Sequence, residues 1–378
     1  MNPTFFLSWL HLLALMDDTV VLATSRDNLV KKVKLLLQFC SKYGMIINEK
    51  KTKLMVINGS ENDKESVIIN DLTIKHCDLY IYLGSPFTSD GTFTSAVKAH
   101  IQEKMAHFHK FIAFVEKNSD IPFVVKKRVF DACLLSAILY GCESWLNGDL
   151  KPVCKIYNWA LKKLLGVRLT TCNDVCYIES GYPSLKALVK GKQRKFFTKM
   201  YNERSMLLDD PLGYVINFVL SNRYTTRTYL KNLIDNNVND IECDRQILKN
   251  NIISSNSSRR ITYFNVMNTS LSVHNIYFKK HNISEFHRIS FTKFRVSSHS
   301  LKVETGRWNR RGRGRLPVEE RLCSCGDIQT EEHVLIHCPL SQHIRNEYNF
   351  SSITDLMLGT FEDDVMCKII FRILNLYD

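Results

Sequence analysis

Two short stretches of this 378-residue chain hold side chains that can bind metal ions. The first is the acidic pair Asp17-Asp18, which interrupts two apolar runs near the N-terminus. Carboxylates are the hard oxygen ligands that Mg²⁺ prefers, and nucleotidyl transfer uses two such ions about 4 Å apart. Because an acidic pair in a turn is more often solvated turn chemistry, the pair by itself indicates a magnesium site only weakly.

The second stretch is a cysteine–histidine cluster with the spacing C-x-C-x7-H-x4-C. Its members are Cys323, Cys325, His333 and Cys338. Four sulfur and nitrogen ligands are what a tetrahedral structural Zn²⁺ site needs. Gly326 permits a tight turn after the first two cysteines, and residues 331–338 are expected to form a short helix that carries His333 and Cys338. His337 is an alternative nitrogen ligand, and the alternative to a zinc site is three reduced cysteines beside a surface histidine.

A basic stretch, residues 305–316 with the sequence TGRWNRRGRGRL, precedes this cluster. Its candidate nucleic-acid-binding residues are Arg307, Trp308, Arg310, Arg311, Arg313 and Arg315. Arginine neutralises phosphates, and a tryptophan can stack on an unpaired base. A solvated flexible linker is the alternative. The net charge of the whole chain, +13, also favours a polyanionic partner such as RNA or DNA.

Strands and helices of ordinary length are expected to position these groups. The apolar runs around Asp17-Asp18 predict a β-hairpin with the acidic pair at its tip. Helical spacing predicts helices over residues 26–43, 97–115, 150–166 and 184–204, with another beginning at Pro122. Thr24 or Ser25 is the expected N-cap of the first, and Gly44 its C-cap. Further strands are expected at 45–47, 53–57 and 79–84, whereas residues 205–290 show only weak periodicity.

Four segments, in order along the chain, resemble a known enzyme family. Leu15-Met16-Asp17-Asp18-Thr19-Val20-Val21-Leu22-Ala23 resembles the aromatic-x-Asp-Asp core of reverse transcriptases. The block Gly44-Met45-Ile46-Ile47-Asn48-Glu49-Lys50-Lys51-Thr52-Lys53 is similar to the segment that follows this core in the non-LTR, LINE-type retrotransposon enzymes. Tyr82-Leu83-Gly84-Ser85 with Asp90-Gly91, and then Tyr140-Gly141-Cys142-Glu143-Ser144-Trp145, are similar to later landmarks of that family. The cysteine–histidine cluster resembles the CCHC motif near the C-terminus of the same enzymes.

The resemblance implies a role for individual residues. Asp17 would be the metal-binding aspartate and Asp18 its partner, with Mg²⁺ as the cofactor and deoxynucleoside triphosphates as the substrates. Lys51 matches a lysine that the family places near the departing pyrophosphate, although a solvated lysine at a strand edge is the alternative. Leu15 departs from the family, which usually has Tyr or Phe there. The implied activity is RNA-directed DNA polymerisation.

The predicted architecture is α+β, with a truncated palm hairpin followed by a largely helical thumb and connection region and a small zinc module. The segments are 1–60 (end of the palm), 61–204 (helical thumb and connection), 205–304 (partly helical), 305–320 (basic linker), 321–340 (CCHC motif) and 341–378 (acidic helical tail). Only 16 residues precede Asp17, and none is acidic. We therefore expect a C-terminal fragment that lacks the fingers and the first palm aspartate, and that is inactive alone. Exposed apolar residues are expected at Phe5, Phe6, Leu7, Trp9 and Leu10.

Other features restrict the remaining classes of function. The 12 cysteines are scattered rather than arranged as a disulfide framework, which indicates a reducing compartment, the nucleus or the cytoplasm. No stretch approaches about 20 uncharged apolar residues, so no membrane span is expected. Two alternatives stay open. The chain could polymerise if a partner or an upstream exon supplied the missing palm and fingers, or it could be a non-catalytic nucleic-acid-binding protein or a decayed remnant without function.

Overall fold

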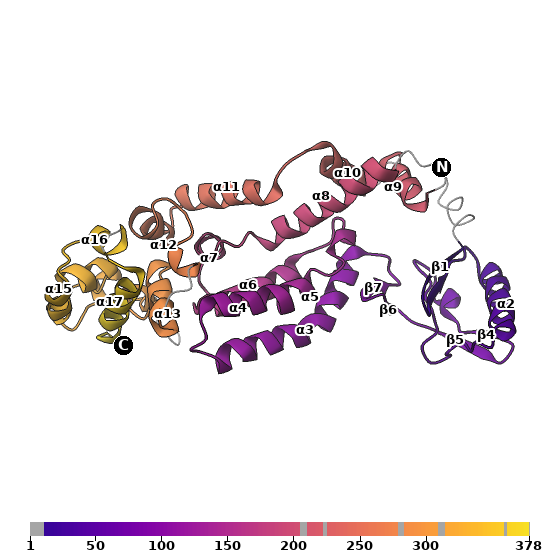
Figure 1. Cartoon of the computed structure of the whole chain (residues 1–378), viewed down its shortest axis with the longest axis horizontal. Coiled ribbons are helices and arrows are strands. Elements are labelled where there is room, and N and C mark those ends of the chain that lie inside the picture. The colour runs from indigo at the N-terminus through magenta and orange to yellow at the C-terminus, as the bar shows by residue number, and fades with distance from the viewer. Residues whose placement is uncertain are drawn as a thin grey trace. The chain divides into compact units, whose positions relative to one another are not determined.

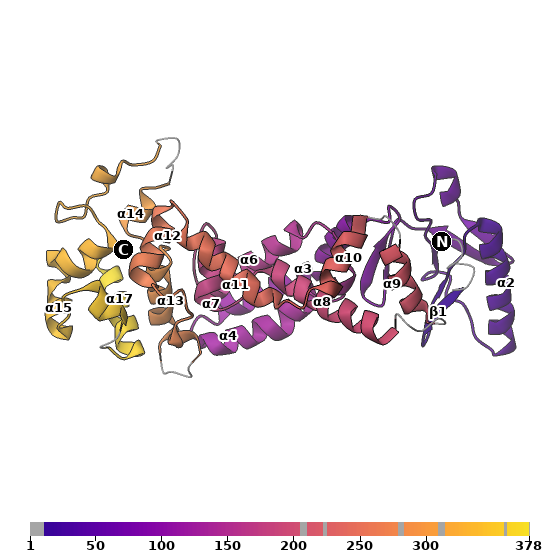
Figure 2. The ribbon, with the colours of Figure 1, turned by 90° about the horizontal axis from the view of Figure 1, so that it is seen from above.

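The computed structural model describes residues 11–204, 210–221, 225–278, 283–308, 314–358 and 361–377. These residues form an α+β fold with small sheets near the N-terminus and helices elsewhere (Figures 1 and 2). The chain divides into two compact units. Unit 1 comprises Met1–Met105, Ile138–Val153 and Leu188–Asn239, and unit 2 comprises Ala106–Ala137, Cys154–Ala187 and Asp240–Asp378. Helices α3 (Phe93–Lys117), α5 (Ser136–Ile138), α6 (Lys151–Leu165) and α8 (Leu185–Arg204) contribute residues to both.

The predicted hairpin is present in unit 1. Strand β1 (Leu12–Leu15) pairs antiparallel with β2 (Asp18–Val21), and Leu15 lies opposite Asp18. The two-residue turn is therefore Met16-Asp17, with Met16 at φ 54°, and not Asp17-Asp18 as predicted. Asp18 is the first residue of β2, because the antiparallel register pairs it with Leu15.

Helix α2 (Arg26–Lys42) follows the hairpin and agrees with its predicted range. The Ser25 side chain accepts a hydrogen bond from the Asn28 N–H, so Ser25 is the N-cap. Gly44 follows the helix at φ +66°, which a glycine adopts without strain. Two strand predictions are wrong in extent: residues 45–47 are not a strand, and β3 is only Lys53–Leu54.

A three-stranded sheet packs against α2, and its two longer strands were not predicted. Strand β5 (Leu72–His76) lies between β4 (Val67–Ile69), which is antiparallel to it, and β3, which is parallel. Val67 and Ile69 are buried while Ile68 between them is exposed, as the alternation of a strand requires. Together with Val33 of α2 and Ile74 of β5 they form a small core.

A second hairpin, β6 (Leu79–Tyr82) and β7 (Ser85–Thr88), connects this sheet to the helices. Its turn is Leu83-Gly84, with both residues at positive φ, as hairpins with a two-residue turn favour. The strand expected over 79–84 is thus shorter, since β6 ends at Tyr82 and residues 83–84 form the turn before β7. Helix α3 (Phe93–Lys117) comes next, and the predicted apolar positions Val97, Ile101 and Phe108 are buried.

The later part of the described chain is mainly α-helical, with short π-helices and 3₁₀-helices between the α-helices. The segment from Pro122 consists of α4 (Phe123–Val129), the π-helix η2 (Phe130–Leu135) and α5 (Ser136–Ile138), followed by η3 (Cys142–Ser144). Helices α6 (Lys151–Leu165), α7 (Asn173–Ser180) and α8 (Leu185–Arg204) come next. The stretch predicted to be weakly periodic contains α9 (Pro211–Ser221), α10 (Thr225–Asp235), α11 (Asp240–Ile253), α12 (Ser258–Thr262), the π-helix η4 (Tyr263–Met267) and η5 (Asn275–Tyr277). Most of it is therefore helix, and α11 packs on α7.

In the C-terminal part of unit 2, helix α13 (Glu285–Arg295) packs against α17 (Asp363–Asn375). Between them in sequence lie α14 (Lys302–Thr305), η6 (Val318–Glu320), the π-helix η7 (His333–His337), η8 (Pro339–Ser341), α15 (Gln342–Tyr348) and α16 (Ile353–Leu358). No helix in the described ranges is both long and apolar enough to cross a membrane.

Buried charges connect the elements of unit 2. The Glu179 carboxylate of α7 accepts hydrogen bonds from the Arg295 guanidinium at 2.7 and 3.2 Å and from the hydroxyls of Tyr263 and Tyr277 at 2.8 and 3.0 Å. Burial raises the pKa of Glu179, but Arg295 and the two hydroxyls outweigh it, so the pKa is lowered from its ordinary value. The Glu179 carboxylate and the Arg295 guanidinium thus form an ion pair with further hydrogen bonds, which buried charges need in order to be tolerated.

Candidate zinc centre and carboxylate hairpin

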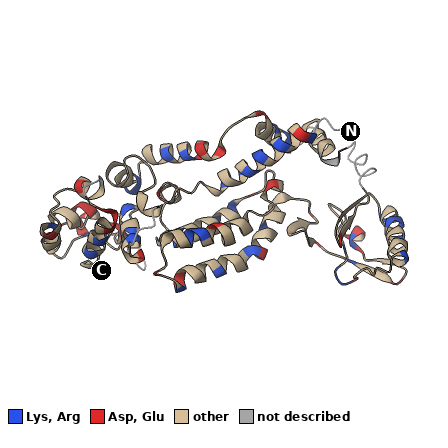
Figure 3. Ribbon diagram, in the orientation of Figure 1, with Lys and Arg blue, Asp and Glu red and all other residues tan. Residues whose placement is uncertain are grey.

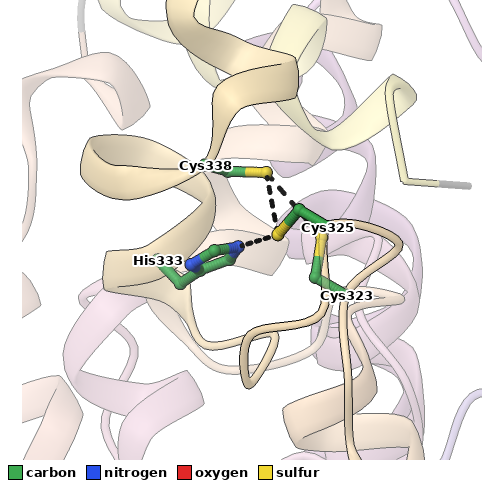
Figure 4. A group of neighbouring side chains, drawn as sticks. All are labelled: Cys323, Cys325, His333 and Cys338. Carbon is green, nitrogen blue, oxygen red and sulfur yellow. Dashed lines mark hydrogen bonds between the residues drawn. The ribbon is translucent and has the colours of Figure 1, made fainter.

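The four predicted zinc ligands come together in unit 2 (Figure 4). Their ligand atoms all lie within 4.8 Å of one another. The Cys338 sulfur is 3.8 Å from the sulfurs of Cys323 and Cys325, and His333 Nε2 is 3.2 Å from the Cys325 sulfur. Sulfur ligands at the usual zinc–sulfur distance stand about 3.8 Å apart along a tetrahedral edge. The residues present therefore fit a zinc ion in both ligand type and spacing.

A tight turn positions the first two cysteines. The Cys323 N–H donates to the Asp327 carbonyl at 2.6 Å, and the Gly326 N–H donates to the Cys323 carbonyl at 3.1 Å. Gly326 has φ +102°, a conformation that other residues rarely adopt, which agrees with the turn predicted there. A bridge between Leu322 and Ile328 closes the loop. The two thiols consequently project from a short, well-fixed segment.

The other two ligands are brought together by the π-helix η7. The Cys338 N–H donates to the His333 carbonyl at 2.7 Å, a bond between residues five apart. In an α-helix such residues point well away from each other, whereas the wider π turn brings them toward one side. The expected short helix is thus present, and its wider turn accounts for the H-x4-C spacing. His337 is not in the cluster: its side chain is 63% exposed and lies 4.0 Å from Glu332.

The electrostatics of the cluster favour a thiolate. Burial opposes ionisation of Cys323, but hydrogen bonds from the Cys325 N–H and from the neighbouring His333 and thiols lower the pKa to about 6. The pKa of Cys325 is lowered by the Asp327 N–H but raised more by desolvation and by the adjacent sulfurs. One anionic sulfur beside protonated partners is a ready first ligand for a cation, since zinc binds the deprotonated form.

The backbone behind Cys338 is held independently of any metal. The Cys338 carbonyl accepts hydrogen bonds from Arg345 Nη2 at 2.8 Å and from the Ser341 hydroxyl at 3.2 Å. Ser341 Oγ also donates to the Val334 carbonyl. The cluster is therefore supported from behind, as structural metal sites require.

The carboxylate pair has no such surroundings. Asp17 and Asp18 are exposed, and the cysteine–histidine cluster is the one group of three or more potential ligands in the described ranges. No third acidic side chain among these residues therefore joins the pair. Lys51 is exposed in the turn before β3, without a hydrogen bond or ion pair from its ammonium to either aspartate in the part of the chain described.

Two of the later sequence landmarks contact each other in unit 1. The Tyr140 hydroxyl donates to the Leu83 carbonyl at 2.8 Å, and a Cβ on Gly141, at φ +68°, would lie 2.9 Å from Ser85 Oγ. The Leu83-Gly84 turn is thus held by the Tyr140 hydroxyl, and a side chain at position 141 would have to adopt the strained positive φ and displace Ser85 Oγ. Contact between the two segments gives a structural reason for their residue types.

Asp90, the acidic residue of the third landmark, organises the start of α3. Its carboxylate accepts hydrogen bonds from the hydroxyls of Ser95 at 2.5 Å and Thr88 at 2.6 Å and from the Thr92 N–H at 3.1 Å. These bonds, with that from Ser95 the largest contribution, hold the pKa of Asp90 well below its usual range. Thr92 Oγ1 accepts a hydrogen bond from the Ser95 N–H as the N-cap of α3, and Asp90 holds both of these residues in place.

Part of the predicted basic stretch is engaged within unit 2. Arg307 pairs with Glu304 at 3.0 Å and donates to Ser258 Oγ at 2.6 Å. The Trp308 ring is covered by the Arg168 guanidinium, 4.2 Å from the ring centroid. Arg315 is exposed. Arg310, Arg311 and Arg313 lie outside the described residues, as do Phe5, Phe6, Leu7, Trp9 and Leu10.

A basic helix was not recognised from the sequence. Helix α8 carries seven Lys or Arg and a single acid, and Figure 3 shows blue residues along it. Its lysines Lys186, Lys190, Lys192, Lys195 and Lys199 are exposed. The signal was readable in the sequence as a cluster of lysines within a predicted helix, and exposed lysines of this kind can contact phosphates.

Comparisons with known proteins agree with the N-terminal resemblance. Residues 4–87 match the family described as "Reverse transcriptase (RNA-dependent DNA polymerase)". The chain is also 28% identical over 163 residues to a putative uncharacterized transposon-derived protein of Caenorhabditis elegans. That match covers 41% of this chain and 56% of the relative, so the chain spans about half the length of the relative. No solved structure matches.

These matches confirm that the chain is reverse-transcriptase-like at its N-terminal end and similar to a transposon-derived protein. The matched segment contains Asp17, Asp18 and Lys51 as well as the β4–β5 and β6–β7 hairpins.

Proposed function

We propose that this chain belongs to the non-LTR, LINE-type group of retrotransposon reverse transcriptases and that, by itself, it binds RNA or DNA without polymerising nucleotides. The observation that supports this is the contrast between two sites. The CCHC cluster is fully assembled, whereas the Asp17-Asp18 hairpin is exposed and has no third acid beside it in the described ranges.

The chemistry of nucleotide addition explains the catalytic half of the proposal. Two Mg²⁺ ions must be held in register to activate the primer hydroxyl and to bind the triphosphate. Two adjacent carboxylates on an exposed turn can bind Mg²⁺ weakly, but the ions also need a further acidic ligand on a rigid support. Mg²⁺ bound at Asp17 and Asp18 would supply that chemistry only with a further carboxylate. Lys51 would then stabilise the departing pyrophosphate.

The nucleic-acid half rests on charge and on the zinc module. Exposed lysines on α8 can neutralise phosphates, and the zinc ion would stabilise the 321–340 module as a small surface for RNA or DNA. Arg310, Arg311, Arg313 and Arg315 of the basic segment are further phosphate contacts in this proposal. Such a protein would act inside the cell, in the nucleus or the cytoplasm.

Primer extension and filter binding test the two halves separately. The purified chain, with Mg²⁺, deoxynucleoside triphosphates and a primed RNA template, is expected to add no nucleotide. Nucleotide incorporation that Asp17→Asn abolishes would overturn the proposal. In filter binding, affinity for the same template should fall steeply as salt rises, because phosphate contacts release counterions. Binding that is weak and independent of salt would favour a decayed remnant instead.

A second candidate function is polymerisation with a palm supplied by another polypeptide. The observation that favours it is the exposure of Leu12, Leu13 and Leu15 on the two-stranded β1–β2 hairpin, since a two-stranded sheet is rarely stable alone. Adding a reverse-transcriptase segment with fingers and a first palm aspartate tests it. Restored primer extension that depends on Asp17 would favour this candidate, and its absence would leave the non-catalytic function.

A further inference from the structure

Unit 2 contains a cavity of about 290 Å³ with a basic, hydroxyl-rich lining and no acidic residue. The polar residues that line it are Arg168, Ser290, Lys293, Ser298, His299 and Ser300. The volume is at the low end for small-molecule sites. It suits a group of a few heavy atoms better than a large cofactor.

Four segments line this cavity: the turn after α6, helix α13, residues 298–300 and Leu374 of α17. The turn after α6 approaches α13 so closely that a Cβ on Gly166, which has φ +76°, would lie 2.8 Å from Ile289 Cγ1. The Arg168 N–H donates to Ser298 Oγ at 2.9 Å, which connects the same turn to residues 298–300. The Ser298 N–H in turn donates to the Lys293 carbonyl at 2.7 Å. Backbone N–H groups and the close approach of Gly166 thus fix the positions of these segments around the cavity.

Two cations of the lining are positioned differently. The Arg168 guanidinium stacks on Trp308, which fixes its plane and leaves its N–H groups directed around its rim. Lys293 is half-buried on α13, and within the described ranges its ammonium has neither an ion pair nor a hydrogen bond. A partly buried cation without a counterion attracts an anion strongly, because the surroundings screen it less than water does.

Two further groups of the lining have unused hydrogen-bonding capacity. Ser298 Oγ accepts hydrogen bonds from the Arg168 N–H and from Thr171 Oγ1, so its own hydrogen remains for donation. His299 is buried, with Nε2 3.0 Å from Glu331 Oε1, and its Nδ1 has no partner among the described residues. Because Nε2 donates to the Glu331 carboxylate, Nδ1 of the neutral ring is an acceptor, so it suits a ligand donor such as the hydroxyl of a monoprotonated phosphate.

We propose that this cavity is a phosphate-binding site. A phosphate group has several acceptor oxygens, which match a fixed guanidinium, an ammonium and serine hydroxyls on different sides of one cavity. The phosphate would come either from the backbone of a bound RNA or DNA or from a free phosphate ester. Only the first source rests on the nucleic-acid binding proposed above.

Calorimetric titration of the full chain with inorganic phosphate, at constant ionic strength, tests the site itself. Lys293→Met removes the ammonium but keeps the length of the side chain, and it is expected to weaken phosphate binding about tenfold or more. Lys368→Met is the matched control: it makes the same charge change at an exposed position of α17 outside the cavity lining. Absence of phosphate binding in the unsubstituted chain, or equal weakening in both variants, would overturn the proposal.

A labelled single-stranded oligonucleotide distinguishes the two sources. If the backbone occupies the cavity, Lys293→Met should also weaken oligonucleotide binding and reduce the slope of log K against log salt by about 0.7, the value for one phosphate contact. Weakening confined to inorganic phosphate would support the cavity with a free phosphate ester as its ligand. Loss of oligonucleotide binding with intact phosphate binding would contradict the proposed function and leave this site standing.

Discussion

Replacing one ligand of the zinc centre gives the sharpest test of the CCHC site. In Cys338→Ser the backbone should stay in place, because Arg345 and Ser341 hold the carbonyl of residue 338. The substitution removes one of four ligands, since a serine hydroxyl is not deprotonated near neutral pH. Structural zinc binding is worth about 10–16 kcal/mol in small zinc modules, or about 3 kcal/mol for each ligand. Zinc affinity should therefore fall on the order of 100-fold or more.

Competition with a chromophoric chelator measures this affinity, and elemental analysis gives the zinc content of the purified chain. Cys243→Ser is the control, because Cys243 is an exposed thiol of α11 outside the cluster. The unsubstituted chain and the control are expected to bind one zinc each. If Cys338→Ser retained zinc with an affinity within about threefold of the control, the four-ligand assignment would be refuted.

Three further predictions concern stability and can be read from urea unfolding. Glu179→Gln should destabilise unit 2 by about 3–5 kcal/mol, because it leaves Arg295 buried without its counterion; the exposed Glu116→Gln is its control and should change stability by less than about 1 kcal/mol. Folding lowers the pKa of Glu179, so the ionised carboxylate stabilises the folded state above the unfolded pKa near 4.5, and this stabilisation is lost as pH falls through the lower folded pKa. The difference in unfolding free energy between Glu179→Gln and the unsubstituted chain should therefore shrink in acid. A difference that stays constant with pH would contradict this. Gly166→Ala should lower the unfolding free energy by about 1–2 kcal/mol through the positive φ alone, and the contact with Ile289 should lower it further. Ser25→Ala should lower it by about 1 kcal/mol through loss of the α2 N-cap. An unchanged unfolding midpoint in either variant would count against the corresponding contact.

Local signals predicted the elements that depend on local interactions. The α2 helix, with its Ser25 cap and Gly44 end, could be identified because capping and helical periodicity involve neighbouring residues. The same holds for the four residues of the cysteine–histidine cluster, whose spacing is set by a turn and one helical segment. The predicted boundaries of the domains remain predictions.

Elements that depend on distant partners could not be identified in this way. The strands β4 and β5 are short, and Val67-Ile68-Ile69 is apolar throughout, so the alternation that marks a strand appears only in its burial. The helices within residues 205–290 have weak periodicity in sequence, and contacts with distant elements, such as that of α11 with α7, stabilise them instead. Glu179 has partners 84 to 116 residues away, so nothing near it in sequence marks it as buried.

The stacking of Arg168 on Trp308 also makes the basic cavity optically observable. Indole emission responds to a neighbouring positive charge and to the water around the ring. A ligand that draws the guanidinium toward itself would therefore change the fluorescence of Trp308 without any attached dye. Of the other tryptophans, Trp145 is buried in unit 1 and Trp159 belongs to α6, so a chain in which Trp308 is replaced by phenylalanine would isolate this signal.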